Sequence, residues 1–184
     1  MKLKKINAVL GLGSIAALMA HVLYNVYCYM VMYYNQVLKI VFTAPVVIFI
    51  CLHAITGMSV LFLHTDGVRA DLYPELNKAT VYQRISAALI FPLLLIHMNT
   101  HHILKATSAP KNAGFFIVII IEILFFSVAM THVATSFSRA LVTLGRLESI
   151  DAKKKLDKAV YIIMGILFAI SVIVIVRGQL ILFS

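Results

Sequence analysis

Apolar residues occur in five long blocks along the chain, and shorter stretches between them hold most of the charged residues. Each block has roughly the 20 residues that an α-helix needs to cross the hydrocarbon core of a membrane. None shows the alternation of apolar and polar residues that marks the strands of a membrane β-barrel. The pattern predicts an all-α, membrane-spanning bundle of five transmembrane helices. They are expected at about Ala8 to Tyr29, Ile40 to Leu63, Ile85 to Leu104, Gly114 to Phe137 and Ala159 to Leu182.

The composition agrees with a membrane protein. Hydrophobic residues make up 62% of the 184 residues, only 12% are charged, and the mean hydropathy is +0.99. Soluble domains carry about a quarter of charged residues, so the apolar excess must face lipid. The stretches between the blocks are too short for an extramembrane domain, and residues 1–184 are expected to form one domain.

The net charge of +9 is distributed unevenly between the two ends of the predicted helices. Twelve of the 16 Lys and Arg residues fall on the N-terminus and on the second and fourth connections, all on one side. The positive-inside rule therefore predicts a cytoplasmic N-terminus and an external C-terminus. A bacterial cytoplasmic membrane is the expected location. A nucleic-acid partner is not expected, because no basic stripe with interleaved aromatic residues occurs.

The start of the chain, with Lys2, Lys4 and Lys5 before an apolar stretch, also has features of a signal peptide. The apolar stretch is longer than the apolar region of a signal peptide, and no clear cleavage site closes it, so a transmembrane helix is favoured. Within that helix, Gly11 and Gly13 predict close packing against a neighbouring helix.

Histidine is the chemical signal of this sequence. Four of the seven histidines lie deep inside the first four blocks, one in each: His21, His53, His97 and His132. An ionisable side chain in hydrocarbon is costly and usually faces the bundle interior. Counting residues along helices of alternating direction places His21 and His97 in an outer layer and His53 and His132 in an inner, cytoplasmic layer.

Two layers with two histidines each suit haem, because its iron takes one imidazole on each face of the macrocycle from facing helices. We predict two haem b groups, with His21 and His97 as axial ligands of the outer iron and His53 and His132 of the inner iron. No C-x-x-C-H motif is present for covalent attachment. The alternative is four unrelated histidines that make structural hydrogen bonds. A metal site without haem is disfavoured by the absence of H-E-x-x-H spacing.

Three further residues are candidates for function. Glu122 is the only acidic residue inside a predicted helix; it is either a protonated acid with a structural hydrogen bond or a proton carrier for a quinone near the outer haem. His101 follows His97 by four residues on the same helix face. It is either an interfacial residue or a contact for a quinone or haem propionate. Arg84 is either a positive-inside anchor or a partner of a propionate.

The remaining polar residues of interest have weaker assignments. His64 and His102 lie at helix ends and are expected to be interfacial. Hydroxyl residues of the fourth predicted helix are expected to bond backbone carbonyls or the ring N–H of a ligating histidine. These are Ser127, Thr131, Thr135 and Ser136.

Three segments around these histidines resemble a known family. They are Gln83-Arg84-Ile85-Ser86 before His97, His53-Ala54-Ile55-Thr56-Gly57, and His132 followed by a basic connection. They are similar to the five-helix, di-haem cytochrome b subunit of succinate dehydrogenases and fumarate reductases that use menaquinone. Ala87 stands where that family has a glycine after the serine.

The resemblance implies the same pairing of haem ligands and adds partners. It implies a membrane anchor that passes electrons between menaquinone and a flavoprotein and an iron–sulfur protein on the cytoplasmic side. The chain itself has no dinucleotide-binding glycine motif and no Cys₄ cluster spacing, so it would be the anchor and not the catalytic core. The alternatives are a haem b anchor of another reductase or dehydrogenase, and a haem-free transporter or proton channel that uses the histidines.

Overall fold

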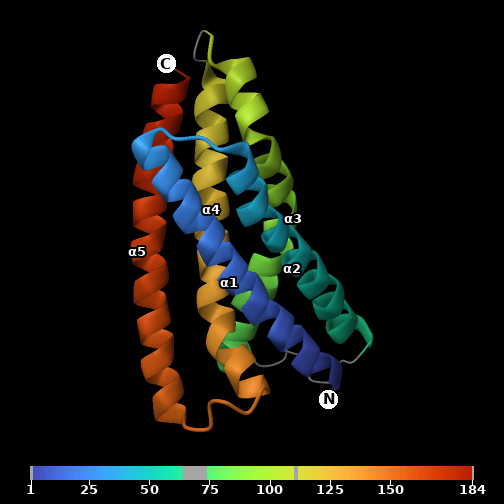
Figure 1. Ribbon diagram of the computed structural model, residues 1–184. Helices are drawn as coiled ribbons and strands as arrows, with labels where there is room; N and C mark the ends of the chain where they lie inside the picture. Colours follow the sequence, from blue (N-terminus) through green and yellow to red (C-terminus); the bar gives the residue numbers. More distant parts are fainter. Residues whose placement is uncertain (1, 64–73, 110–111, 184) are drawn as a thin grey trace.

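The described residues, 2–63, 74–109 and 112–183 of the computed structural model, form five helices and no β-strand (Figure 1). His64 lies outside the described residues. Each helix is long and apolar enough to span a membrane, as in a multi-pass membrane protein, so the predicted all-helical architecture is confirmed. The helices are α1 (Lys2–Val31), α2 (Gln36–Leu63), α3 (Pro74–Thr107), α4 (Ala113–Thr143) and α5 (Ile150–Leu182).

The helices extend beyond the predicted apolar blocks, mainly at ends that carry charged residues. The helix α3 begins at Pro74 and α5 at Ile150, each well before the apolar block itself. Polar residues with high helix propensity extend these helices into the membrane interface, where water can hydrogen-bond to their side chains. The start of α5 is capped by Ser149, whose hydroxyl accepts a hydrogen bond from Ala152 N, and Asp151 in the first turn suits the helix dipole.

Consecutive helices run in opposite directions (Figure 1), and they pack as two hairpins and a fifth helix. The first hairpin is α1 with α2, and the second is α3 with α4. The fifth helix packs against α4 and α1, and α1 also contacts α4. Within the described part of the chain, the backbone of α2 comes close only to that of α1, and the backbone of α3 only to that of α4.

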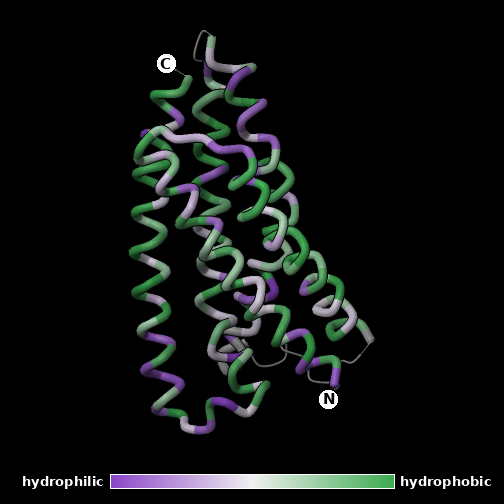
Figure 2. Tube along the Cα trace, viewed as in Figure 1, coloured by the Kyte–Doolittle hydropathy of each residue, from purple (hydrophilic) through white to green (hydrophobic). Residues whose placement is uncertain are grey.

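Apolar side chains cover the outside of the bundle, as lipid requires. Figure 2 shows apolar residues along the length of every helix, with hydrophilic residues gathered near the N-terminal ends of α1 and α5. On α2, Val41, Ile48, Ile55 and Phe62 are all exposed at a spacing of seven residues. Seven residues are two helical turns, so these side chains form one stripe. A stripe of this kind in a membrane helix faces the acyl chains.

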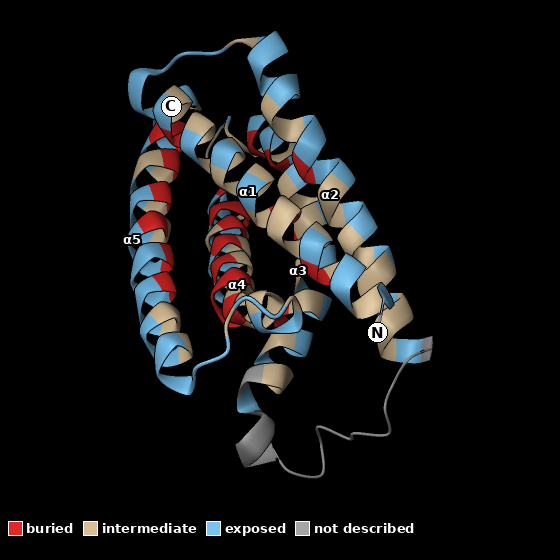
Figure 3. Cartoon of the chain, turned by 60° about the horizontal axis from the view of Figure 1, so that its bottom comes forward, coloured by how far each residue is buried: buried red, intermediate tan, exposed pale blue. Residues whose placement is uncertain are grey.

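The core lies mainly between α4 and α5. Figure 3 shows buried residues along the facing sides of these two helices, whereas α1 and α2 carry few. One buried cluster joins α4 and α5 and is covered by partly buried residues of α1; it contains Met130, Val133, Ala134, Val160, Met164 and Leu167. A second joins the end of α3 to the start of α4, where Leu104 and Phe115 are almost completely buried.

Glycines permit the closest helix contacts, as the sequence predicts for Gly11 and Gly13. A Cβ at Gly13 would lie 2.7 Å from Cε1 of Phe49 on α2, closer than a side chain tolerates. A Cβ at Gly178 of α5 would collide with the ring of Tyr29 on α1. The α1–α5 contact therefore depends on a residue without a side chain at position 178.

This dependence predicts that Gly178→Ala weakens the bundle. The matched control is Gly165→Ala on the same helix, because no atom lies within 4 Å of the Cβ that alanine would add there. Both changes raise helix propensity equally, so their difference isolates the collision with Tyr29. We expect Gly178→Ala to be less stable than Gly165→Ala by about 1–3 kcal/mol in unfolding measurements on the purified protein in detergent. Equal stabilities of the two variants would contradict the packing described here.

Candidate functional site

The four intramembrane histidines occupy equivalent places on their helices. Each lies ten or eleven residues before the last residue of its helix, which is Val31, Leu63, Thr107 or Thr143. Because α1 and α3 run opposite to α2 and α4 (Figure 1), the histidines fall at two levels of the bundle. We call His21 and His97 the first histidine pair, and His53 and His132 the second histidine pair.

The members of each pair lie near one another across helices that do not pack together. His21 is within electrostatic range of His97, and His132 is within electrostatic range of His53. Yet among the described residues no Cα of α1 lies within 8 Å of one in α3, and the same holds for α2 and α4. Directly packed helices have axes about 8–10 Å apart. Each histidine pair is therefore formed by two helices that are not in direct contact with each other.

His53 is fixed by the first helix. Its Nδ1 lies 3.1 Å from the backbone oxygen of Asn7, which can only accept a hydrogen bond, so Nδ1 carries the proton. The side chain of Asn7 in turn accepts a hydrogen bond of 2.9 Å from Thr56 of α2. A Cβ at Gly11 would lie 3.0 Å from Cε1 of His53, so this glycine makes room for the ring.

His132 is fixed by a serine of α3. Its Nδ1 lies 3.1 Å from Oγ of Ser86, which is buried. The hydroxyl proton of Ser86 is directed at the backbone oxygens of Tyr82 and Gln83, at 2.7 and 3.1 Å. The serine oxygen is thus left to accept the Nδ1–H of His132.

His97 is fixed by an acid. Its Nδ1 lies 3.1 Å from Oε1 of Glu122 on α4, and Oε2 of the same carboxyl group accepts a hydrogen bond of 2.8 Å from Nε2 of Gln179 on α5. Glu122 is 6% exposed and Gln179 2% exposed, whereas the side chain of His97 is 28% exposed. Tyr29 of α1 is also within electrostatic range of Glu122. Four helices therefore meet around this carboxyl group.

His21 has contacts at both ring nitrogens. Its Nδ1 lies 3.3 Å from Oγ1 of Thr43 on α2, and its Nε2 lies 3.3 Å from Nδ2 of Asn25 one turn later. Nδ2 of Asn25 also donates to the backbone oxygen of His21 at 2.8 Å. Coordination of a metal by Nε2 of His21 requires this amide to give up its contact with the ring while it keeps the backbone bond.

In all four rings Nδ1 faces an oxygen, and in three of them Nε2 is left to act as an electron-pair donor. In His53, His97 and His132 no hydrogen bond engages Nε2 among the described residues. Metal-ligating histidines typically donate the opposite ring N–H to an oxygen, which fixes the tautomer and the ring orientation. The chemistry of these donors therefore fits a haem held by histidine side chains.

A metal ion bound without a macrocycle would need a group of side chains as its ligands. No group of three or more His, Cys, Asp or Glu side chains comes together in the described part of the chain. A haem requires only two axial ligands from the protein, because the macrocycle supplies the others.

The other predicted candidates lie apart from the histidine pairs. His101 is exposed, and its ring contacts those of His102 and Phe183 at 6.2 and 5.3 Å between centroids. No hydrogen bond joins His101 to Glu122 within the described residues. Arg84 is exposed on α3.

Arg139 of α4 takes a position that the sequence did not single out. Its guanidinium donates to Oε1 of Gln83 at 2.8 Å and to Oγ1 of Thr80 at 2.5 Å, and it lies within electrostatic range of Arg84. It thereby joins the end of α4 to the start of α3, three residues before Ser86. The only sequence signal is its place as the first basic residue after the apolar block of α4.

The hydroxyl residues of α4 mostly serve the helix itself. Thr135 donates to the backbone oxygens of Thr131 and His132, which is one of the two roles expected from the sequence. Oγ of Ser136 is buried without a hydrogen-bond partner among the described residues. The partner of His132 comes from α3 instead, which sequence position alone does not indicate.

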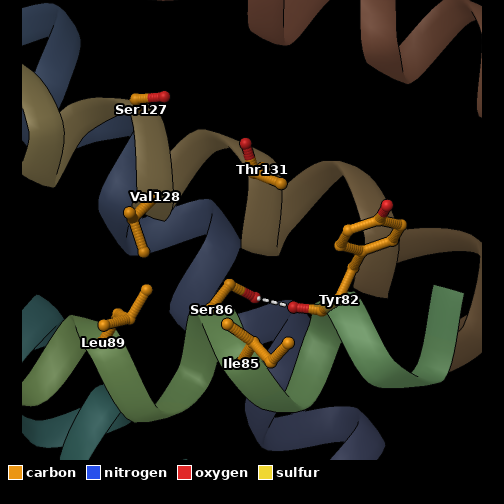
Figure 4. A pocket seen from close by; sticks show the side chains of 7 residues that line it. All are labelled: Tyr82, Ile85, Ser86, Leu89, Ser127, Val128 and Thr131. Atoms are coloured by element: carbon orange, nitrogen blue, oxygen red, sulfur yellow. Dashed lines mark hydrogen bonds between the residues drawn. The ribbon is translucent and has the colours of Figure 1, made fainter. Parts of the chain in front are cut away.

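Ser127 and Thr131 lie at a small pocket between α3 and α4 (Figure 4). Its volume is about 150 Å³. Val128 and Leu89 line it from the two helices, and Ser86, the partner of His132, lies at its edge. The pocket is thus adjacent to the second histidine pair but does not include a histidine.

No protein-family model, curated protein or solved structure matches this chain. The function proposed below therefore rests on the residues and geometry described here, together with the sequence resemblance.

The contacts of Arg139 predict a local effect of its removal. In Arg139→Met the two side-chain bonds to α3 are lost, and hydrogen bonds to charged groups contribute roughly 1.5–3 kcal/mol. We expect faster hydrogen exchange at the amides of residues 80–86, with little change in α5. Arg146→Met is the matched control, since Arg146 is exposed in the α4–α5 connection. The same exchange rates in Arg139→Met and Arg146→Met would contradict the assigned role.

Proposed function

We propose that this protein is a di-haem cytochrome b that anchors a cytoplasmic oxidoreductase to the membrane and carries electrons between that enzyme and a quinone. The proposal is carried by four intramembrane histidines that form two pairs, each pair on two helices that do not contact each other. In every one of these histidines Nδ1 faces an oxygen at hydrogen-bonding distance. Four unrelated structural histidines give no reason for that shared orientation.

The protein holds and orients the proposed cofactors through these side chains. His21 and His97 ligate one haem iron, and His53 and His132 ligate the other. Asn7, Ser86, Glu122 and Thr43 keep Nε2 of each ring free of its proton. Each bound haem supplies a one-electron redox centre. Held by His21 with His97 and by His53 with His132, two such centres would supply a route for electrons across the membrane.

The proposed partners are inferred from the family resemblance and from the distribution of basic residues. The segments around His53, Ser86 and His132 favour a succinate dehydrogenase or fumarate reductase with flavoprotein and iron–sulfur subunits, and menaquinone as the quinone. The N-terminus of α1 and the α4–α5 connection lie at the same end of the bundle (Figure 1). Both are basic, with exposed Lys2, Arg146 and Lys154. We assign this end to the cytoplasm of a bacterium, where the soluble subunits bind.

Two roles are proposed for the remaining candidates. Glu122 is proposed to exchange protons with a quinone near the first histidine pair, because its carboxyl group is hydrogen-bonded to His97. His101 at the end of α3 is proposed as a contact for the quinone headgroup, and Arg84 as a partner of a haem propionate.

The haem assignment predicts that histidine variants separate into two groups. The chain, purified from cells replete with haem, is expected to show haem b absorbance with two midpoint potentials. His21→Ala and His97→Ala should each remove the same potential, and His53→Ala and His132→Ala should each remove the other. His102→Ala serves as control, because this exposed residue is not assigned as a ligand. A different grouping would refute the pairing, and absence of Soret absorbance would favour the haem-free transporter or channel.

The identity of the soluble partner requires a separate test in native membranes. Succinate should reduce both haems, and fumarate should reoxidise them, if the partner is a succinate dehydrogenase or fumarate reductase. The measurement is the haem difference spectrum, with dithionite reduction as the reference for total haem. Reduction by dithionite but not by succinate would leave the haem assignment intact and point to the anchor of a different reductase or dehydrogenase.

A further inference from the structure

Glu122 distinguishes His97 from the other three histidines. The oxygen at Nδ1 of His21, His53 and His132 belongs to a neutral hydroxyl or backbone carbonyl group. At His97 alone it belongs to a carboxyl group, which is 6% exposed and lies inside the bundle. An acid in this position is costly in a membrane interior, and such residues usually have a function.

Gln179 has a specific relation to this carboxyl group. Its Nε2 donates to Oε2 of Glu122, whereas its Oε1 is buried and has no hydrogen-bond partner among the described residues. A buried amide is expected to use both ends. The orientation of Gln179 is therefore determined by its bond to Glu122, even though one polar atom is left unpaired.

We propose that Glu122 and Gln179 are positioning residues that set the electron donation of His97 to the haem iron held by the first histidine pair. This proposal rests on the proposed function. An acceptor at Nδ1–H draws the proton away from the ring and increases the basicity of Nε2. A more basic ligand stabilises ferric iron over ferrous iron, so the midpoint potential falls.

The two residues act in opposite directions. Glu122 accepts the Nδ1–H of His97 and strengthens the ligand. Gln179 donates to the other carboxyl oxygen, which withdraws electron density and weakens the pull of Glu122 on His97. A purely structural role predicts something else, since loss of either residue would then loosen the same ring in the same way.

The experiment uses the full-length protein with its haems and reads out the midpoint potential. A His132→Ala background leaves only the haem of the first histidine pair, so that a single potential is measured. Glu122→Gln keeps the shape of the side chain but provides a weaker acceptor. We expect the reduction equilibrium to shift about tenfold toward ferrous iron, a rise of about 59 mV for one electron. Gln179→Leu is expected to lower the same potential.

If Glu122→Gln fails to fold or to bind haem, Gln179→Leu still tests the proposal. Gln179→Leu removes the unpaired buried oxygen together with the bond to Glu122, so the bundle should tolerate it. Ser171→Ala in the same His132→Ala background is the matched control, because Ser171 is also buried on α5 and its Oγ has no hydrogen-bond partner among the described residues. It should leave the potential of the first pair unchanged.

Each outcome decides between the two proposals. Absence of haem in the wild-type protein overturns the proposed function. Normal haem with an unchanged potential in Glu122→Gln overturns only the positioning role, as does a rise in potential in Gln179→Leu. A rise in Glu122→Gln together with a fall in Gln179→Leu supports it.

Discussion

The structure depends on one constraint: a polar side chain within a lipid-embedded bundle must find its partner inside the bundle. A buried donor or acceptor left unpaired costs roughly 1–3 kcal/mol, and the membrane offers no water to replace the lost bond. The four intramembrane imidazoles meet this constraint in the same way, through an oxygen at Nδ1. Two of these oxygens tie α1 to α2, and the other two tie α3 to α4. The site and the helix hairpins are therefore held by the same interactions.

The sequence predicts the architecture well because hydrocarbon imposes a simple rule on length and composition. All five helices lie where the apolar blocks occur, and only their polar ends were underestimated. The two levels of histidines also follow from counting residues along helices that alternate in direction. Neither inference needs knowledge of how side chains pack. Both rest on the rise per residue of the α-helix and on the thickness of the membrane.

The partners of the histidines were harder to predict. Ser and Thr in membrane helices can always return to their own backbone, as Thr135 does, so their presence says little about contacts across helices. Ser86 also donates to its own backbone, and whether a hydroxyl oxygen additionally meets a side chain of another helix depends on helix rotation and separation. Ser86 reaches His132 from α3, and Gln179 reaches Glu122 from α5. Such contacts involve residues 46 or 57 positions apart and leave no local pattern.

The division into two hairpins and a final helix has a consequence for biogenesis. Helices leave the ribosome in order, and both α1 with α2 and α3 with α4 find their main partner among immediate neighbours. Each hairpin can thus form as soon as its second helix is inserted. The last helix contacts both hairpins, through α1 and α4. The two hairpins also meet directly through α1 and α4, so insertion of α5 adds a second connection between halves that are already in contact.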